Sequence, residues 1–366
     1  MLRRVLFLER RKIIIAGAVL GCLGVLLVHF GNPVNMGICV ACFIRDIAGG
    51  LGFHRAAPVQ YIRPEILGFI LGSFLIALIN GEFRPRGGSS PLIRFFMGAA
   101  LMIGALVFLG CPLRMVLRLA AGDLNALVGL GGFIFGIFIG IQFLKKGFSL
   151  GRSQKQPVAN GLAMPTLALA LLALVIIAPA FIHFSVSGPA ASHVPVLIGL
   201  GAGLLVGVVI QRTRLCQAGC FRDLMLIRDP HLLYGTIAIF MSALVMNIAF
   251  KYFKLGFIGQ PVAHTEHLWN FIGLAVVGLA ATLLGGCPLR QVIMAGEGDT
   301  DAGMVFLGML AGAAVAHNFG LAASGDGVPV AGKIGVLIAA LFLITVGFAF
   351  SVPAQLSKKG GTTLGV

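Results

Sequence analysis

Long hydrophobic stretches dominate the chain, separated by short segments that carry charge, proline or glycine. The first stretch runs from Ile13 to about Phe30 and, at 1.5 Å per residue, nearly crosses a hydrocarbon core about 30 Å thick. Nine further stretches share this length and character, at residues 64–80, 93–111, 124–144, 161–182, 195–212, 232–250, 268–286, 301–322 and 332–352. The pattern therefore predicts an all-α polytopic membrane protein with about ten transmembrane helices.

Composition supports this fold class and excludes others. Hydrophobic residues make up 58% of the 366 residues and charged residues only 11%, whereas soluble domains carry about a quarter charged residues. The 27 basic and 12 acidic residues give a net charge of +15, and the basic excess lies mainly in short connections. This distribution follows the positive-inside rule and does not form a nucleic-acid-binding face. We expect membrane lipids, and no nucleic acid, around the protein.

The basic residues also predict the topology. Five of them precede the first stretch: Arg3, Arg4, Arg10, Arg11 and Lys12. The later basic connections carry Arg84, Arg86, Arg94, Lys145, Lys146, Arg152, Lys155, Arg212, Arg214, Lys358 and Lys359. Both termini are then cytoplasmic in a multi-pass protein of the bacterial inner (plasma) membrane. The first stretch is interpreted as a helix and not as a signal peptide, because it is long and no cleavage pattern precedes Gly31.

Four segments are too short and too polar to cross a membrane, at residues 37–48, 112–120, 214–224 and 288–296. They lie in a repeated pattern. With an offset of 177 residues (39 + 177 = 216), Cys39, Arg45 and Asp46 align with Cys216, Arg222 and Asp223. With an offset of 176, the run Gly110-Cys111-Pro112-Leu113-Arg114 recurs as Gly286-Cys287-Pro288-Leu289-Arg290. The short segments are therefore predicted to be re-entrant or half helices at matching positions of two repeats.

One unpaired stretch, 161–182, lies between the two four-span repeats, so the second repeat is expected to have inverted topology. The predicted organisation is as follows: cytoplasmic N-terminus 1–12, transmembrane repeat 13–144, cytoplasmic linker with connecting helix 145–194, inverted repeat 195–322, last transmembrane helix 323–352 and cytoplasmic tail 353–366. Such inverted repeats place a substrate site near the membrane midplane.

Cysteine and arginine recur together in these repeats. Proline favours the first helical position, which places Cys111 and Cys287 at the N-caps of short helices, where free N–H groups and the helix dipole favour an anion. Asn35 or Thr213 is expected to cap the short helices with Cys39 and Cys216. A polarizable thiol suits weak contact with a soft sulfur or selenium anion. The candidate substrate-pathway residues are Cys39, Cys111, Cys216, Cys287, Arg45, Arg114, Arg222, Arg290, Cys42 and Cys220.

Alternatives remain for several of these residues. Ordinary buried packing is the alternative role for the cysteines. Structural ion pairs, of Arg45 with Asp46 and of Arg222 with Asp223, are the alternative role for these arginines. The spacing of Cys39, Cys42, Cys216 and Cys220 also allows a four-thiolate zinc site, although our prediction is no metal and no cofactor. No phosphate-binding motif of an ATPase occurs. A membrane thiol–disulfide or quinone-linked oxidoreductase using Cys39-x-x-Cys42 is the alternative function.

At these residues the chain resembles the YeeE/YedE family of membrane transporters, which have a duplicated sulfur-transport domain, over roughly residues 12–352. The resemblance implies an hourglass-shaped permease, not an enzyme, that passes an anion such as thiosulfate between Cys39, Cys111, Cys216 and Cys287. The run from Asn35 to Asp46 is more similar to the YedE-like branch described as selenium transporters. The resemblance also implies a cytoplasmic sulfur-carrier partner of the TusA type. The expected function is import of a small selenium- or sulfur-containing anion.

Overall fold

The computed structural model describes residues 2–351, with side chains from Glu9 onward, and this part of the chain is almost entirely helical. Ten helices or helix pairs in it are long and apolar enough to cross a membrane. The long helices are α1 (Leu2–His29), α3 (Pro64–Ile79), α4 (Pro91–Phe108), α6 (Asn125–Lys145), α7 (Val158–Ile177), α8 (Val196–Thr213), α10 (His231–Ala249), α11 (His267–Leu283), α13 (Thr300–Asn318) and α14 (Val330–Ala349). The protein is thus an all-α polytopic membrane protein, as the hydrophobic pattern predicts.

The four predicted short segments are separate helices. They are α2 (Val40–Gly50), α5 (Pro112–Ala120), α9 (Gln217–Ile227) and α12 (Pro288–Gly296). A 3-10 turn, η1 (Ala57–Val59), and the antiparallel pair of β1 (Arg86–Gly87) and β2 (Gln154–Lys155) complete the regular elements of the described chain. At 9 to 11 residues, each short helix is about 13 to 17 Å long and covers only half of a bilayer core.

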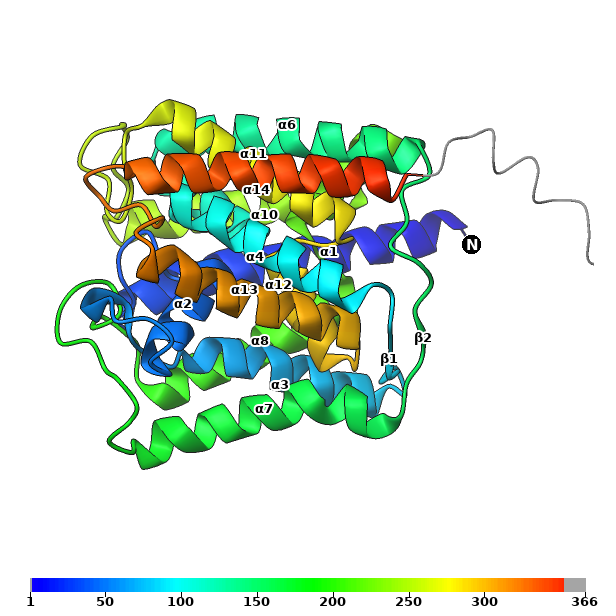
Figure 1. Cartoon of the computed structure of the whole chain (residues 1–366), viewed down its shortest axis with the longest axis horizontal. Helices are drawn as coiled ribbons and strands as arrows, with labels where there is room; N and C mark the ends of the chain where they lie inside the picture. The colour runs from blue at the N-terminus through cyan, green and yellow to red at the C-terminus, as the bar shows by residue number, and fades with distance from the viewer. Residues whose placement is uncertain (1, 352–366) are drawn as a thin grey trace, which may run out of the picture.

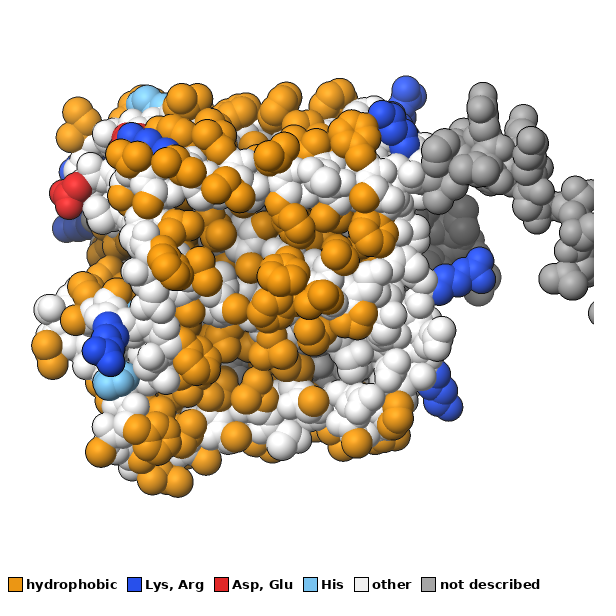
Figure 2. Space-filling view, in the orientation of Figure 1, with side chains coloured by type: hydrophobic (Ala, Val, Ile, Leu, Met, Phe, Trp, Pro, Cys, Tyr) orange, Lys and Arg blue, Asp and Glu red, His pale blue; other side chains and the backbone are white. Residues whose placement is uncertain are grey.

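The long helices run side by side between two ends of the molecule (Figure 1). The β1–β2 pair, the start of α1 and the end of α14 share one end, which we call the basic face. Its basic side chains include Arg84, Arg86, Arg94, Lys145, Lys146, Arg152 and Lys155. The other end, the far face, carries the connections 51–63, 178–195, 250–266 and 319–329. Figure 2 shows mainly hydrophobic side chains on the surface between the two ends, as lipid contact requires.

Two helix boundaries differ most from the sequence expectation. Helix α1 begins at Leu2, so residues 2–12 of the predicted N-terminal segment continue the first span as helix, because Leu, Arg, Glu and Lys all favour helix. Helix α7 ends at Ile177 and not at residue 182. Ala178 is left-handed, with φ of 45°, and Pro179 follows it, so the backbone cannot continue the helix.

Equivalent helices of the two halves make equivalent contacts. The contact between α3 and α8 corresponds to the contact between α10 and α1. In the same way, the contact between α4 and α13 corresponds to that between α11 and α6. The short helices follow the same rule, since α12 contacts α3 and α5 contacts α10. Helices α7 and α14 stand outside this correspondence: α7 lies mainly against α3, and α14 mainly against α4.

Glycines allow these helices to approach closely. A Cβ atom added to Gly136 of α6 would lie 1.9 Å from the carbonyl oxygen of Ala275 in α11, and one added to Gly132 would lie 2.0 Å from that of Phe271. Neither backbone can shift without separating the two helices, so these glycines set how closely α6 packs against α11.

We predict that Gly136→Ala destabilises the protein by roughly 1–3 kcal/mol, because the added methyl group overpacks the α6–α11 interface. Gly131→Ala is the matched control on the same helix, since its Cβ would lie 3.7 Å from the Phe271 ring, an ordinary contact. Thermal unfolding of both purified variants in detergent checks the prediction. Equal midpoints for the two variants would contradict the proposed packing constraint.

Candidate functional site

Each of the four short helices begins directly after a cysteine. Cys39, Cys111, Cys216 and Cys287 are the N-cap residues of α2, α5, α9 and α12, all with extended backbone. The Cys39 sulfur accepts a hydrogen bond from the Cys42 N–H at 3.3 Å, and the Cys216 sulfur accepts one from the Gly219 N–H at 3.3 Å. All four cysteines thus lie at positive helix ends.

The expectation that Asn35 or Thr213 caps α2 or α9 is wrong. Thr213 is the last residue of α8, and its hydroxyl donates to the Val209 carbonyl one turn earlier. Asn35 lies in the connection before α2, where its amide reaches the Pro261 carbonyl at 3.5 Å. The sulfurs of Cys39 and Cys216 take the N-cap positions instead, because their short side chains reach the first free N–H groups as serine would.

The four N-cap cysteines form two pairs. The Cys39 thiol lies next to the Cys111 thiol, and the Cys216 thiol lies next to the Cys287 thiol. The Cys287 N–H also donates to the Cys216 sulfur at 3.3 Å. The N-termini of α2 and α5 therefore meet at one pair, and those of α9 and α12 meet at the other.

Backbone donors surround the two pairs in the same way. The N–H groups of Val40 and Arg114 face the Cys111 sulfur, and those at the equivalent positions, Gln217 and Arg290, face the Cys287 sulfur. Each pair thus offers thiol and backbone donors at two converging positive helix ends, the arrangement that favours an anion.

The remaining cysteines differ between the halves. Cys42 is buried beside the Cys39–Cys111 pair, and its sulfur accepts from Arg114 Nη1 at 3.3 Å. Cys220 is buried on α9, next to the hydroxyl of Thr236. In the part of the chain that the structure describes, no three His, Cys, Asp or Glu side chains are arranged to hold a metal ion.

Two of the four candidate arginines form ion pairs with the next residue. Arg45 Nη2 lies 2.7 Å from Asp46 Oδ1, and Arg222 Nε lies 2.8 Å from Asp223 Oδ1. The other Asp46 oxygen binds Nε of Arg63 at 2.8 Å, a buried arginine that the sequence analysis did not single out. Arg45 and Asp46 are buried, whereas about a quarter of the Arg222 and Asp223 side chains is exposed. These contacts fit the structural ion pairs that the sequence offered as an alternative.

Arg114 and Arg290, by contrast, have different partners although their motifs are identical. The buried Arg114 donates to the carbonyl oxygens of Asn35 at 2.6 Å, Val262 at 3.0 Å and Leu109. Leu109 directly follows α4, so Arg114 bonds a carbonyl left free at that helix end. In the second half Gln291 has this role.

Gln291 Nε2 donates to the carbonyl oxygens of Leu284 at 3.1 Å and Gly286 at 3.3 Å, at the end of α11. The Arg290 guanidinium is therefore free to extend to Glu297, whose carboxylate it meets at 2.8 Å and 3.3 Å. Sequence repetition alone does not reveal this difference, although Gln291 replaces Met115 at the equivalent position.

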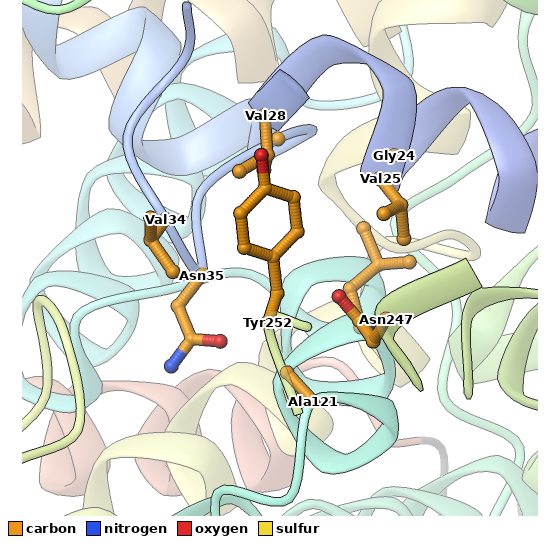
Figure 3. Close-up of a pocket in the computed structure, with 10 residues that line it drawn as sticks. Gly24, Val25, Val28, Val34, Asn35, Ala121, Asn247 and Tyr252 are labelled. Carbon is orange, nitrogen blue, oxygen red and sulfur yellow. The ribbon is translucent and has the colours of Figure 1, made fainter. Parts of the chain in front are cut away.

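A cavity lies on the far-face side of the molecule, close to the Cys39–Cys111 pair. Its volume is about 20 Å³, little more than one water needs. Asn35, Asn247 and Tyr252 project around it (Figure 3), and Gly37, two residues before Cys39, also lines it. The Cys39–Cys111 pair therefore has no wide opening at this cavity.

A larger cavity of about 140 Å³ lies at the basic face, and we call it the arginine vestibule. Its lining residues are Glu82, Arg84, Arg86, Gln211, Arg214, Arg290 and Glu297. The Gln211 amide donates to Glu82 at 2.6 Å and lowers the pKa of that carboxyl group, which keeps Glu82 ionised. The vestibule is thus a polar space in which four guanidinium groups meet two carboxylates.

Comparison with known proteins agrees with this cysteine arrangement. The chain matches the sequence profile named Sulphur transport over residues 1–112 and 212–326, more than half of its length, and these ranges contain all four N-cap cysteines. The chain belongs to the sulphur transport (YeeE/YedE) family. The resemblance noted from the repeated cysteine motifs is confirmed at this level.

Two curated members of the family match part of the chain. The thiosulfate transporter TsuA of Spirochaeta thermophila is 36% identical over 104 residues, which are 28% of this chain and 31% of that protein. The thiosulfate transporter TsuA of Escherichia coli K12 is 32% identical over 104 residues, 28% of this chain and 29% of that protein. The matched stretch spans less than a third of the length of either relative.

Arg118 of α5 and Asp123 form a fully buried ion pair at 2.7 Å, which the sequence analysis also did not single out. We predict that Asp123→Asn destabilises the protein by about 3–5 kcal/mol, because Arg118 then keeps a buried charge without its counter-ion. Unfolding in detergent checks this prediction. Glu9→Gln is the control, since the exposed Glu9–Lys12 pair is screened by water and should contribute far less to stability. Equal losses in both variants would rule out the role of burial.

Proposed function

We propose that this family member is a permease, and not an enzyme, which imports a small sulfur- or selenium-containing anion across the bacterial inner membrane. The observation that supports it is the pairing of Cys39 with Cys111 and of Cys216 with Cys287, each pair at two helix N-termini. Such sites attract an anion without placing a full positive charge against it.

The chemistry of the two pairs suits passage better than storage. A thiol is a weak donor with a polarizable sulfur, so it contacts a soft anion without holding it tightly. Conduction requires sites that are favourable enough to fill and weak enough to empty. In this proposal the anion moves from the Cys39–Cys111 pair to the Cys216–Cys287 pair, with Cys42 and Cys220 beside the pathway. The buried Arg114, which donates to carbonyl oxygens and to the Cys42 sulfur, provides positive charge beside the first pair.

The proposed orientation in the membrane follows from charge. By the positive-inside rule the basic face is cytoplasmic, so the chain termini are cytoplasmic and the Cys39–Cys111 pair is reached from outside. Two inverted halves, residues 13–144 and 195–322, then contribute one thiol pair near each side. A TusA-type sulfur-carrier protein, if it accepts the imported sulfur, would bind at the basic face.

Thiosulfate is the first substrate to test, because both matched relatives are thiosulfate transporters. Selenite is the second, because the run from Asn35 to Asp46 resembles the selenium-associated branch. Comparing radiolabelled forms of both anions in cells that lack their own importers identifies the transported element.

A thiol–disulfide oxidoreductase is the alternative, since Cys39, Cys42 and Cys111 lie together. It requires that two of these thiols form a disulfide and are reduced again during turnover. Alkylation of free thiols with a mass-tagged reagent, before and after substrate addition, distinguishes the two functions. A disulfide that cycles with substrate supports the oxidoreductase, and thiols that stay reduced during uptake support the permease.

We predict that Cys111→Ala and Cys287→Ala each reduce uptake roughly tenfold or more, because each removes one thiol from its pair, and a hydrogen bond to a charged group contributes about 1.5–3 kcal/mol. Cys22→Ala is the matched control, since Cys22 lies on α1 outside both pairs. Immunoblots of membrane fractions establish equal protein levels. Wild-type uptake by both pathway variants would refute the proposed site.

A further inference from the structure

The arginine vestibule has more positive charge than its own residues neutralise. Arg290 is paired with Glu297, and Arg86 Nε lies 2.9 Å from Asp299. Glu82 receives hydrogen bonds from Gln211 and from Arg212, which lies outside the lining. The side chains of Arg84 and Arg214 make no hydrogen bond or ion pair with any other residue between positions 9 and 351. Two guanidinium groups therefore line one cavity without a direct ion pair, and Glu82, which binds Gln211 and Arg212, attracts them only through its charge.

One further feature indicates that the vestibule has polar groups available to a ligand. The side-chain oxygen of Gln211 is buried without a hydrogen-bond partner, although its amide nitrogen holds Glu82. Arg214 ends α8 in a left-handed conformation, with φ of 55°, as helix ends commonly do.

Arg290 connects the vestibule to the Cys216–Cys287 pair. Its backbone N–H faces the Cys287 sulfur, while its guanidinium lines the cavity. The thiol pair and the vestibule thus share one residue, which places the vestibule on the basic-face side of this pair. The volume of about 140 Å³ holds an anion of a few non-hydrogen atoms with some water, whereas drug-sized ligands need roughly 300–1,000 Å³.

The first half of the molecule has no equivalent set of residues. Arg114 is buried against backbone carbonyls, and Ala121 occupies the position of Glu297, since 121 + 176 = 297. The ion pair between Arg290 and Glu297 is thus specific to the second half. The vestibule is an addition at the basic face and not a product of the repeat.

We propose that the arginine vestibule is a separate binding site for a small oxyanion with two negative charges, which holds the transported anion at the basic face before release. Its assignment to the transported anion rests on the proposed function, whereas its anion-binding chemistry does not. Guanidinium groups bind oxyanions in a bidentate manner, so Arg84 and Arg214 would provide the first contacts. Glu297 competes with the anion for Arg290, which keeps the affinity low enough for release.

Isothermal titration of purified protein in detergent with thiosulfate, and separately with sulfate, tests this site. We expect the double variant Arg84→Gln and Arg214→Gln to bind thiosulfate about tenfold or more weakly than wild type, because charge-assisted hydrogen bonds are lost. The matched control is Arg152→Gln with Lys155→Gln, two exposed cations of the same face outside the vestibule. Its affinity should change less than about threefold.

Two additional variants keep the test decisive. Cys111→Ala with Cys287→Ala should retain thiosulfate binding while uptake falls, which separates the vestibule from the thiol pairs. Glu297→Gln removes the carboxylate that competes for Arg290 and should tighten binding about threefold, a gain that misfolding cannot produce.

Each outcome has one meaning. If the Arg84/Arg214 double variant binds thiosulfate and sulfate as tightly as the control, the vestibule proposal is overturned, whatever the uptake assay shows. If vestibule-dependent binding occurs but wild-type protein takes up neither thiosulfate nor selenite, the permease proposal fails and the anion site stands. If binding disappears in the double cysteine variant but persists in the double arginine variant, the anion binds at the thiols and not in the vestibule.

Discussion

Backbone polar groups inside a membrane must be satisfied by the protein itself, and the interrupted spans of this chain depend on that constraint. Four helices begin within the helical bundle, so each has N–H groups without intrahelical partners. Cysteine sulfurs accept two of these bonds, from Cys42 and Gly219, and further N–H groups face the Cys111 and Cys287 sulfurs. The candidate anion sites thus arise from the same groups that a membrane protein has to satisfy in order to fold.

The helices that end inside the bundle also leave C=O groups without intrahelical partners, and the two halves satisfy these groups differently. Arg114 bonds the Leu109 carbonyl after α4 with its guanidinium, which buries a charge. Gln291 does the same after α11 with a neutral amide. Because Gln291 stands where the first half has Met115, the Arg290 guanidinium can extend to the basic face instead. Duplication supplied two similar thiol pairs, and divergence in their carbonyl partners made the two sides of the molecule different.

Positive charge acts at several distances in this architecture. Arg45, Arg63 and Arg118 are buried with carboxylates close by, so they stabilise the helix connections and present little free charge. Helix dipoles and thiols act directly at the two pairs. Unpaired guanidinium groups occur in the vestibule, where water is available. In the proposed pathway, this order gives weak sites inside the membrane and a stronger one at the basic face, as a conducting protein needs.

The sequence by itself determined the class of protein and most of its helices, because membrane spans are long, apolar and bounded by charge, which are local properties. It also determined the duplicated motifs and, through proline at the first helical position, the N-cap placement of Cys111 and Cys287. Only the tertiary structure decided which cysteines meet, that Cys39 and Cys216 cap their own helices, and that Arg114 and Arg290 have different partners. These features depend on contacts between residues far apart in the chain, for which the local pattern carries no information.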